Sequence, residues 1–130
     1  MKPVNIMLNG LPGNVASTIA VHAIKDERVN LLPYSLTGPE IDAQMCAIGN
    51  MTVELVQPAV RSERIRAIAE KHERFISVDF THPSALNDNA AFYCEQNLPF
   101  VMGTTGGDRE KLNQAVVRSS VCAVIAPNMA

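Results

Sequence analysis

The hydrophobic positions along this chain change their spacing at regular intervals. Short runs of consecutive apolar residues, typical of buried strands, alternate with longer stretches whose apolar residues recur three and four positions apart, as in helices. The pattern predicts strands over residues 4–8, 29–36, 51–56, 75–80, 99–102 and 121–126, and helices over residues 13–24, 58–72, 83–96 and 109–118.

Prolines and polar residues sharpen several of these boundaries. Asp108 is a suitable cap for the last helix, Pro83 suits the first turn of the helix before it, and Asn97 suits a left-handed position after that helix ends. Pro33 predicts a bend, or a place away from the centre of a sheet, for the strand over 29–36. Residues 37–50 show the weakest pattern, and we expect a loop there with a short helix.

The order of these elements predicts the fold class. Strands that alternate with helices through short connections favour a parallel sheet covered by helices, and right-handed crossovers then place helices on both faces. We therefore expect an α/β fold of the Rossmann type, with a doubly wound, mostly parallel sheet. A chain of 130 residues is long enough for one such domain.

Composition and charge narrow the possible partners. The chain is 47% hydrophobic and 18% charged with a net charge of -2, so no basic excess favours nucleic acid. Arg and Lys gather between Arg61 and Arg74, but Glu63, Glu70 and Glu73 are interleaved, which is typical of a solvated helix face. No apolar stretch is long enough for a signal peptide or a membrane span.

The cysteines suggest neither a disulfide framework nor a metal site. Cys46, Cys94 and Cys122 are widely spaced, odd in number and form no CxxC pair. We therefore expect a cytoplasmic protein with no bound metal and no membrane partner.

The turn after the first predicted strand carries the first functional signal. Gly10-Leu11-Pro12-Gly13-Asn14-Val15 lies between a strand and a helix, where glycine permits a sharp turn and close approach of a pyrophosphate. The N–H groups of the following helix can then hold the anion. A tight turn without a ligand would show the same glycines. No Gly-Lys-Ser/Thr follows, so the turn is not a nucleoside-triphosphate loop.

Three later segments also follow predicted strands at their carboxyl ends. They are Asp79-Phe80-Thr81-His82, Gly103-Thr104-Thr105-Gly106-Gly107 and Ala126-Pro127-Asn128-Met129. Each alone is ordinary turn chemistry. Because open parallel sheets bind ligands at this edge, all of them together with the Gly10 turn favour one shared site.

These segments resemble the 4-hydroxy-tetrahydrodipicolinate reductase family, also called dihydrodipicolinate reductase, and most of all its plant-like branch. The resemblance is strongest over Asp79-Phe80-Thr81, Gly103-Thr104-Thr105-Gly106-Gly107-Asp108 and Ala126-Pro127-Asn128-Met129. It implies hydride transfer from NADPH or NADH to a cyclic dicarboxylate in lysine biosynthesis through diaminopimelate. It also implies a homo-oligomer for the full-length enzyme.

The resemblance further implies which residues meet the cofactor. The pyrophosphate would lie on the turn from Gly10 to Val15, and Thr81 would touch the cofactor from the neighbouring strand. The nicotinamide end would lie along three residues, Gly103, Thr104 and Thr105. The same pocket would be closed by Ala126, Pro127, Asn128 and Met129.

In the family a second domain carries the catalytic histidine and lysine and a Ser-Gly-Thr motif, and none of these matches here. We therefore expect residues 1–130 to be the N-terminal NAD(P)-binding domain of a longer enzyme, with the C-terminal substrate domain absent and no turnover by this chain alone. His22 and His72 are expected to be structural or solvated, and His82 to shape a helix entry rather than to act in catalysis.

Two departures from the family pattern bear on the cofactor. Asn14-Val15 stands where the family usually has Arg or Lys followed by Met, which removes a cation beside the phosphates. Near the expected ribose position, Ser35 and Thr37 are the polar residues, able to donate to a ribose or simply to form a turn. The choice between NADH and NADPH stays open, and the missing carboxylate favours NADPH.

Two alternative hypotheses stay open, the first of them because of these departures. One is a non-catalytic relative that keeps the fold as a binding or assembly module. The other is a free-standing nucleotide-binding regulator, which would require Ala130 to be the natural C-terminus.

Overall fold

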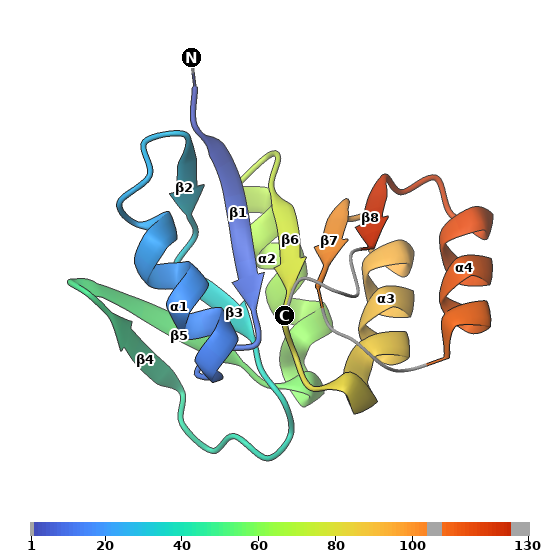
Figure 1. Cartoon of the computed structure of the whole chain (residues 1–130), viewed down its shortest axis with the longest axis horizontal. Coiled ribbons are helices and arrows are strands. Elements are labelled where there is room, and N and C mark those ends of the chain that lie inside the picture. The colour runs from blue at the N-terminus through green and yellow to red at the C-terminus, as the bar shows by residue number, and fades with distance from the viewer. Residues whose placement is uncertain (1, 104–107, 126–130) are drawn as a thin grey trace.

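The computed structural model describes residues 2–103 and 108–125, and Figure 1 shows a central parallel sheet with helices around it. The five strands of this sheet are ordered β2-β1-β6-β7-β8. Their bounds are β1 Val4–Asn9, β2 Val29–Leu31, β6 Ile76–Asp79, β7 Phe100–Met102 and β8 Ala123–Ile125. Every pair within this sheet is parallel, so the predicted fold class is confirmed.

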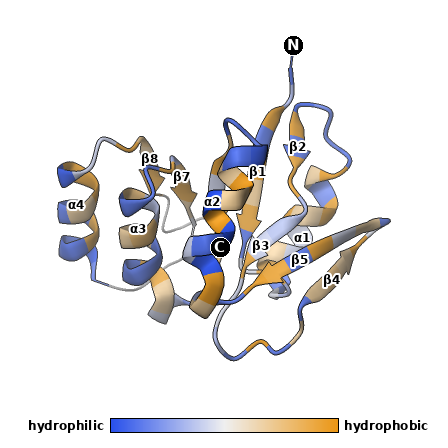
Figure 2. Ribbon diagram, turned by 180° about the vertical axis from the view of Figure 1, so that it is seen from behind, coloured by the Kyte–Doolittle hydropathy of each residue, from blue (hydrophilic) through white to orange (hydrophobic). Residues whose placement is uncertain are grey.

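Helices cover both faces of the sheet. They are α1 Asn14–Ala23, α2 Arg61–Lys71, α3 Leu86–Glu95 and α4 Arg109–Arg118. In Figure 1 α1 lies in front of the sheet, and in Figure 2, the view from behind, α2 lies in front. Figure 2 also shows α2 and α4 banded in blue and orange, as expected for helices with one face against the sheet.

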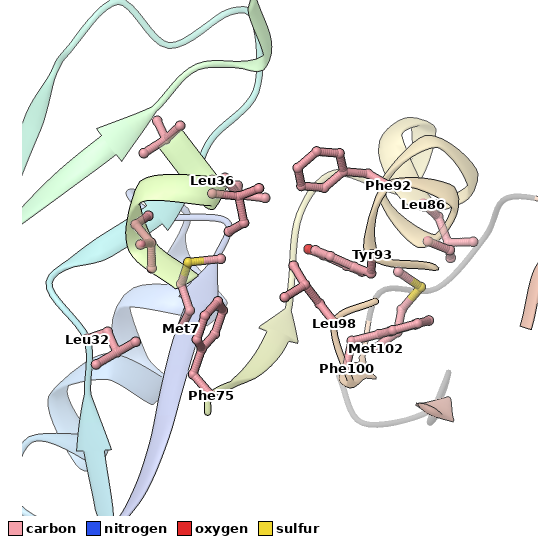
Figure 3. Close-up of a cluster of buried hydrophobic side chains, with 14 of the residues drawn as sticks. Met7, Leu32, Leu36, Phe75, Leu86, Phe92, Tyr93, Leu98, Phe100 and Met102 are labelled. Atoms are coloured by element: carbon pink, nitrogen blue, oxygen red, sulfur yellow. The ribbon is translucent and has the colours of Figure 1, made fainter. Parts of the chain in front are cut away.

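The side-chain alternation of the central strand separates two hydrophobic clusters. Met7 of β1 belongs to the cluster that includes residues of α2, α3 and α4, which Figure 3 shows. Its neighbour Leu8 belongs to the other cluster, with Ala16 and Ala20 of α1. The small alanines let α1 lie close to the strand, at the place where the glycine turn enters the helix.

The predicted strand over 29–36 divides into two strands at Pro33. Leu32 still donates its N–H to Ile6 of β1, whereas the carbonyl of Pro33 accepts from Glu54. Because proline has no N–H, the ladder along β1 cannot continue through it. The chain therefore changes partner, and β3, Tyr34–Leu36, belongs to a second sheet ordered β3-β5-β4.

The expected loop is confirmed for residues 37–44, but the expected short helix is wrong, because the segment ends in a strand. β4, Met45–Ile48, pairs antiparallel with β5, Met51–Val56, and Ile48 lies opposite Met51. Only Gly49 and Asn50 connect them, and Gly49 has φ +58°. A Gly-Asn pair between two apolar runs is a known hairpin signal. The prediction from apolar spacing did not use this signal and therefore missed the strand.

The expected helix boundaries are confirmed where a side chain defines them. The carboxylate of Asp108 accepts from the N–H of Lys111, 3.1 Å away, and Asn97 has φ 57°. Two short 3₁₀ turns, Pro58–Val60 and Pro83–Ala85, precede α2 and α3. Within the part of the chain described, no helix is long and apolar enough to cross a membrane.

Candidate functional site

A cleft of about 770 Å³ opens at the carboxyl ends of β1, β3 and β6. It brings together three segments that are far apart in the sequence: the glycine turn after β1, residues 37–41 after β3, and residues 80–85 after β6. The start of α2 and the first turn of α3 complete its lining. Among the predicted site residues, the cleft is lined by Gly10, Pro12, Gly13, Asn14, Val15, Thr37 and Thr81.

Two glycines set the shape of the turn. Gly10 has φ +114°, and a Cβ there would lie 2.5 Å from the carbonyl oxygen of Phe80. A Cβ on Gly13 would lie 2.9 Å from the carbonyl oxygen of Gly10. Both positions thus require glycine for close backbone packing, as the sequence predicted.

Helix α1 begins directly after this turn and opens toward the cleft. Gly13 is its N-cap residue, and no side chain caps its first N–H groups. Asn14 and Val15, the first two helical residues, line the cleft. Unpaired N–H groups and the positive end of a helix together form an anion site.

The structure places Ser35 and Thr37 beneath the glycine turn. The buried N–H of Leu11 donates to Ser35 Oγ at 3.2 Å, and Thr37 Oγ1 donates to the Leu11 carbonyl at 2.9 Å. Ser35 is fully buried and does not reach the cleft, whereas Thr37 lines it. Both hydroxyls therefore hold the turn in position, and Leu11 is a buried anchor of the turn rather than part of the cleft surface.

A buried polar network supports the floor of the cleft. Asp79, at the end of β6, is fully buried and accepts from Tyr93 Oη and from Asn89 Nδ2, the latter at 3.1 Å. Asn9, at the end of β1, donates to Tyr93 Oη at 2.9 Å and accepts from the N–H of Leu36 at 2.9 Å. Burial and the neighbouring Asp79 carboxylate raise the pKa of Tyr93 well above its usual value of 10. Tyr93 thus remains a hydrogen-bond donor that joins α3 to two strand ends.

The network continues to the cleft surface through Thr81. Its hydroxyl donates to Asp79 Oδ1 at 2.7 Å and accepts from Asn89 Nδ2 at 2.9 Å. The next residue, His82, accepts a hydrogen bond from the N–H of Ser84 at 3.1 Å through its Nδ1 and caps the 3₁₀ turn before α3. The prediction that His82 shapes a helix entry is confirmed.

Gly103 packs beside the cleft. Its N–H donates to the carbonyl of Asp79 at 3.0 Å, and a Cβ at Gly103 would lie 2.3 Å from the Phe80 ring. The other residues expected at the nicotinamide end lie outside the described residues: Thr104, Thr105, Ala126, Pro127, Asn128 and Met129.

Three charged residues that line the cleft were not predicted: Glu40, Arg61 and Asp88. Arg61, expected on a solvated helix face, is half-buried and lines the cleft, because α2 starts at the carboxyl end of β5. Glu40 also lines the cleft, and its carboxylate lies over Gly38, within 2.5 Å of where a Cβ of Gly38 would be. Pro58 after the predicted strand indicates a helix that starts at the edge of the sheet, close to Arg61. The sequence does not give the direction of the Arg61 side chain, because that direction depends on tertiary packing.

Comparison with known proteins adds a family to this geometry. Residues 4–129 match the family model described as dihydrodipicolinate reductase, N-terminus. The chain is 38% identical over 126 residues to 4-hydroxy-tetrahydrodipicolinate reductase 1, chloroplastic, of Arabidopsis thaliana, covering 97% of this chain and 36% of that protein. It is 33% identical over 124 residues to the probable 4-hydroxy-tetrahydrodipicolinate reductase 2, chloroplastic, of Oryza sativa subsp. japonica, covering 95% of this chain and 38% of that protein. A reductase of Methanosphaera stadtmanae is 30% identical over 136 residues, covering 98% and 48%.

Proposed function

Since this chain belongs to the family of dihydrodipicolinate reductase N-terminal domains, we propose that it is the cofactor domain of a 4-hydroxy-tetrahydrodipicolinate reductase. The observation that carries the proposal is the glycine turn after β1, whose helix opens uncapped on a cleft large enough for a ligand. The cofactor is NADH or NADPH. Its pyrophosphate lies against the turn from Gly10 to Val15 and the N-terminus of α1.

The two halves of the cofactor lie along the edge formed by the carboxyl ends of the strands. The adenosine half lies toward the segment after β3, where Thr37 and Gly38 line the cleft. The nicotinamide half lies past Thr81, toward Gly103 and onward to the segments around Thr104 and Asn128. Every one of these positions follows a strand of the sheets at its carboxyl end.

The reaction itself is the reduction of a cyclic dicarboxylate by hydride transfer. The chain spans 36% of the length of the Arabidopsis relative. In this proposal the substrate contacts and the catalytic groups lie elsewhere in the full-length enzyme. The described residues provide cofactor binding and orientation. The homo-oligomer stays a prediction, as does the cytoplasmic location, which the plant relatives, named as chloroplastic, do not support.

Calorimetric titration of NADPH and NADH tests the proposal. Gly13→Val brings three carbons against the Gly10 carbonyl and into the helix entrance, and we expect at least a tenfold loss of affinity for both cofactors. Gly49→Ala is the control, because a Cβ at Gly49 would also be crowded, 2.8 Å from Ile24 Cδ1, but Gly49 lies in the β4–β5 hairpin and does not line the cleft. It should cost stability and leave both affinities unchanged. Equal binding by wild type and Gly13→Val would exclude the glycine turn as the phosphate site.

A further inference from the structure

Arg61 is held in a defined position at the cleft. One of its guanidinium N–H groups donates to Asn89 Oδ1 at 2.8 Å, and its Cζ lies 4.3 Å from the centre of the Phe92 ring. Asn89 is in turn fixed by Asp79 and Thr81. The guanidinium is therefore oriented in advance by a flat aromatic surface and an amide, which leaves most of its five donors for a ligand.

Arg61 forms no ion pair with a carboxylate among the described residues, and the buried Asp79 lies one side chain away, on the other side of Asn89. Two other arginines of the described residues form ion pairs: Arg64 with Glu54 at 2.8 Å and Arg28 with Asp26 at 2.8 Å. Arg61 has no carboxylate within 4 Å in the described part of the chain, although it is half-buried. Of the described residues that line the cleft, it is also the only Arg or Lys. A partly desolvated cation in such a position favours an anionic ligand.

The topology places Arg61 on the adenosine side of the cleft. β3 and β5 are parallel, with Leu36 opposite Val56, so the chain leaves both strands at the same edge. Thr37 and Gly38 follow β3, where doubly wound folds bind the adenosine ribose, and Pro58 and Arg61 follow β5. The pyrophosphate site at Gly10–Gly13 belongs to another strand, β1. Arg61 thus faces the same space as the ribose-reading segment.

Two carboxylates in the cleft oppose the binding of an anionic ligand. Glu40 and Asp88 both line it, and a carboxylate near the ribose favours the unphosphorylated cofactor. Both are exposed, however, and Glu40 lies on a loop. Exposed charges are strongly screened by water and salt, whereas Arg61 is half-buried and fixed by two contacts. The arginine therefore dominates the local preference.

From this arrangement we infer that Arg61 selects NADPH over NADH by binding the 2′-phosphate of the adenosine ribose. The inference rests on the proposed function. A planar guanidinium can donate two parallel N–H bonds to one phosphate, with Asn89 and Phe92 keeping its plane in place. The selecting residue thus belongs to α2, which follows β5, and not to the end of β3.

Two pairs of ligands isolate the 2′-phosphate in a test. NADPH and NADH differ by this group alone, and so do adenosine 2′,5′-bisphosphate and adenosine 5′-phosphate. We would titrate all four into the chain by calorimetry. Wild type should bind the phosphorylated member of each pair at least tenfold more tightly, and Arg61→Gln should lower this ratio at least fivefold with little change in NADH affinity.

Two further variants make the result specific. Arg66→Gln removes the same charge from the exposed side of the same helix and should leave both ratios unchanged. Arg61→Lys keeps the charge without the planar fork, and an intermediate ratio is expected. Circular dichroism and thermal melting of each variant check that it is folded.

The outcomes separate this inference from the proposed function. Wild type that binds neither dinucleotide overturns the proposed function. Wild type that binds both, with Arg61→Gln weakening NADPH and NADH equally or weakening neither, overturns the role of Arg61 alone. A wild type that prefers NADH would also overturn it and would assign the ribose to Glu40.

Discussion

At the scale of single residues, the cleft depends on two hydroxyl groups that hold the glycine turn in position. Ser35 and Thr37 were expected near the ribose because they lie at the end of the second predicted strand. Their hydroxyls are instead bonded to the backbone of Leu11. These bonds satisfy polar groups that the turn buries, since Leu11 is only 1% exposed.

Replacing Ser35 should therefore weaken the fold and the phosphate site together. Ser35→Ala leaves the buried N–H of Leu11 without its acceptor, which costs about 1–3 kcal/mol of unfolding free energy. Urea denaturation measures this loss, and calorimetry should show weaker dinucleotide binding.

Ser77 is a matched control for this experiment. It is also fully buried, but its Oγ has no hydrogen-bond partner among the described residues. Ser77→Ala should therefore be neutral or stabilising, because it removes an unsatisfied polar group. If the two alanine variants had equal stability, the Ser35–Leu11 bond would have no structural importance.

At the scale of elements, the cleft depends on how α3 is fastened to the strand ends. Tyr93 of α3 contacts Asp79 of β6 and Asn9 of β1 through one hydroxyl. In Figure 3 that hydroxyl is directed away from α3, while the ring packs with Phe92 and Phe100. The ring and the hydroxyl thus join the hydrophobic cluster to the polar network.

Tyr93 should also make stability depend on pH above 10. Its pKa is raised in the folded protein, so above pH 10 the unfolded chain loses this proton while the folded chain keeps it. The free energy of unfolding should therefore fall as the pH rises past 10. Tyr93→Phe should lose about 1–3 kcal/mol at pH 7, because the partners of the hydroxyl are left buried.

Urea denaturation at pH 7 and pH 10.5 tests both expectations. The decrease between the two pH values should be smaller in Tyr93→Phe than in wild type. Tyr34→Phe changes the only other tyrosine of the chain, which is half-buried, and should retain the wild-type decrease. A pH dependence unaffected by Tyr93→Phe would contradict the role assigned to its buried proton.

At the scale of the whole molecule, cofactor binding and turnover should be separable. Orienting a substrate against the cofactor contributes roughly 7–11 kcal/mol to lowering a reaction barrier. We expect these 130 residues alone to bind NADPH and to show no oxidation of it that depends on the dicarboxylate substrate. Absorbance of the reduced nicotinamide measures this directly, and measurable turnover by the chain alone would contradict the proposed division of the enzyme.

Much of the architecture could be predicted from local pattern. Apolar spacing predicts the strands around Val4, Ile76 and Phe100 and the helices between them. Capping chemistry predicts the start of α4 at Asp108 and the end of α3 before Asn97. The glycine turn was also predictable, because a positive φ and a close backbone contact restrict Gly10. The β4 strand was missed, since its two-residue hairpin signal was read as part of a loop.

The sequence by itself determined the sheet, its flanking helices and the place of the phosphate turn, because these depend on neighbours a few positions apart. Only the tertiary structure decided what surrounds that turn. Ser35 was turned inward, and Arg61, typical of a solvated helix face, was brought into the cleft. The physical reason is that these directions depend on the pairing of β3 with β5 and on contacts with Leu11, Asn89 and Phe92, which are distant in the sequence.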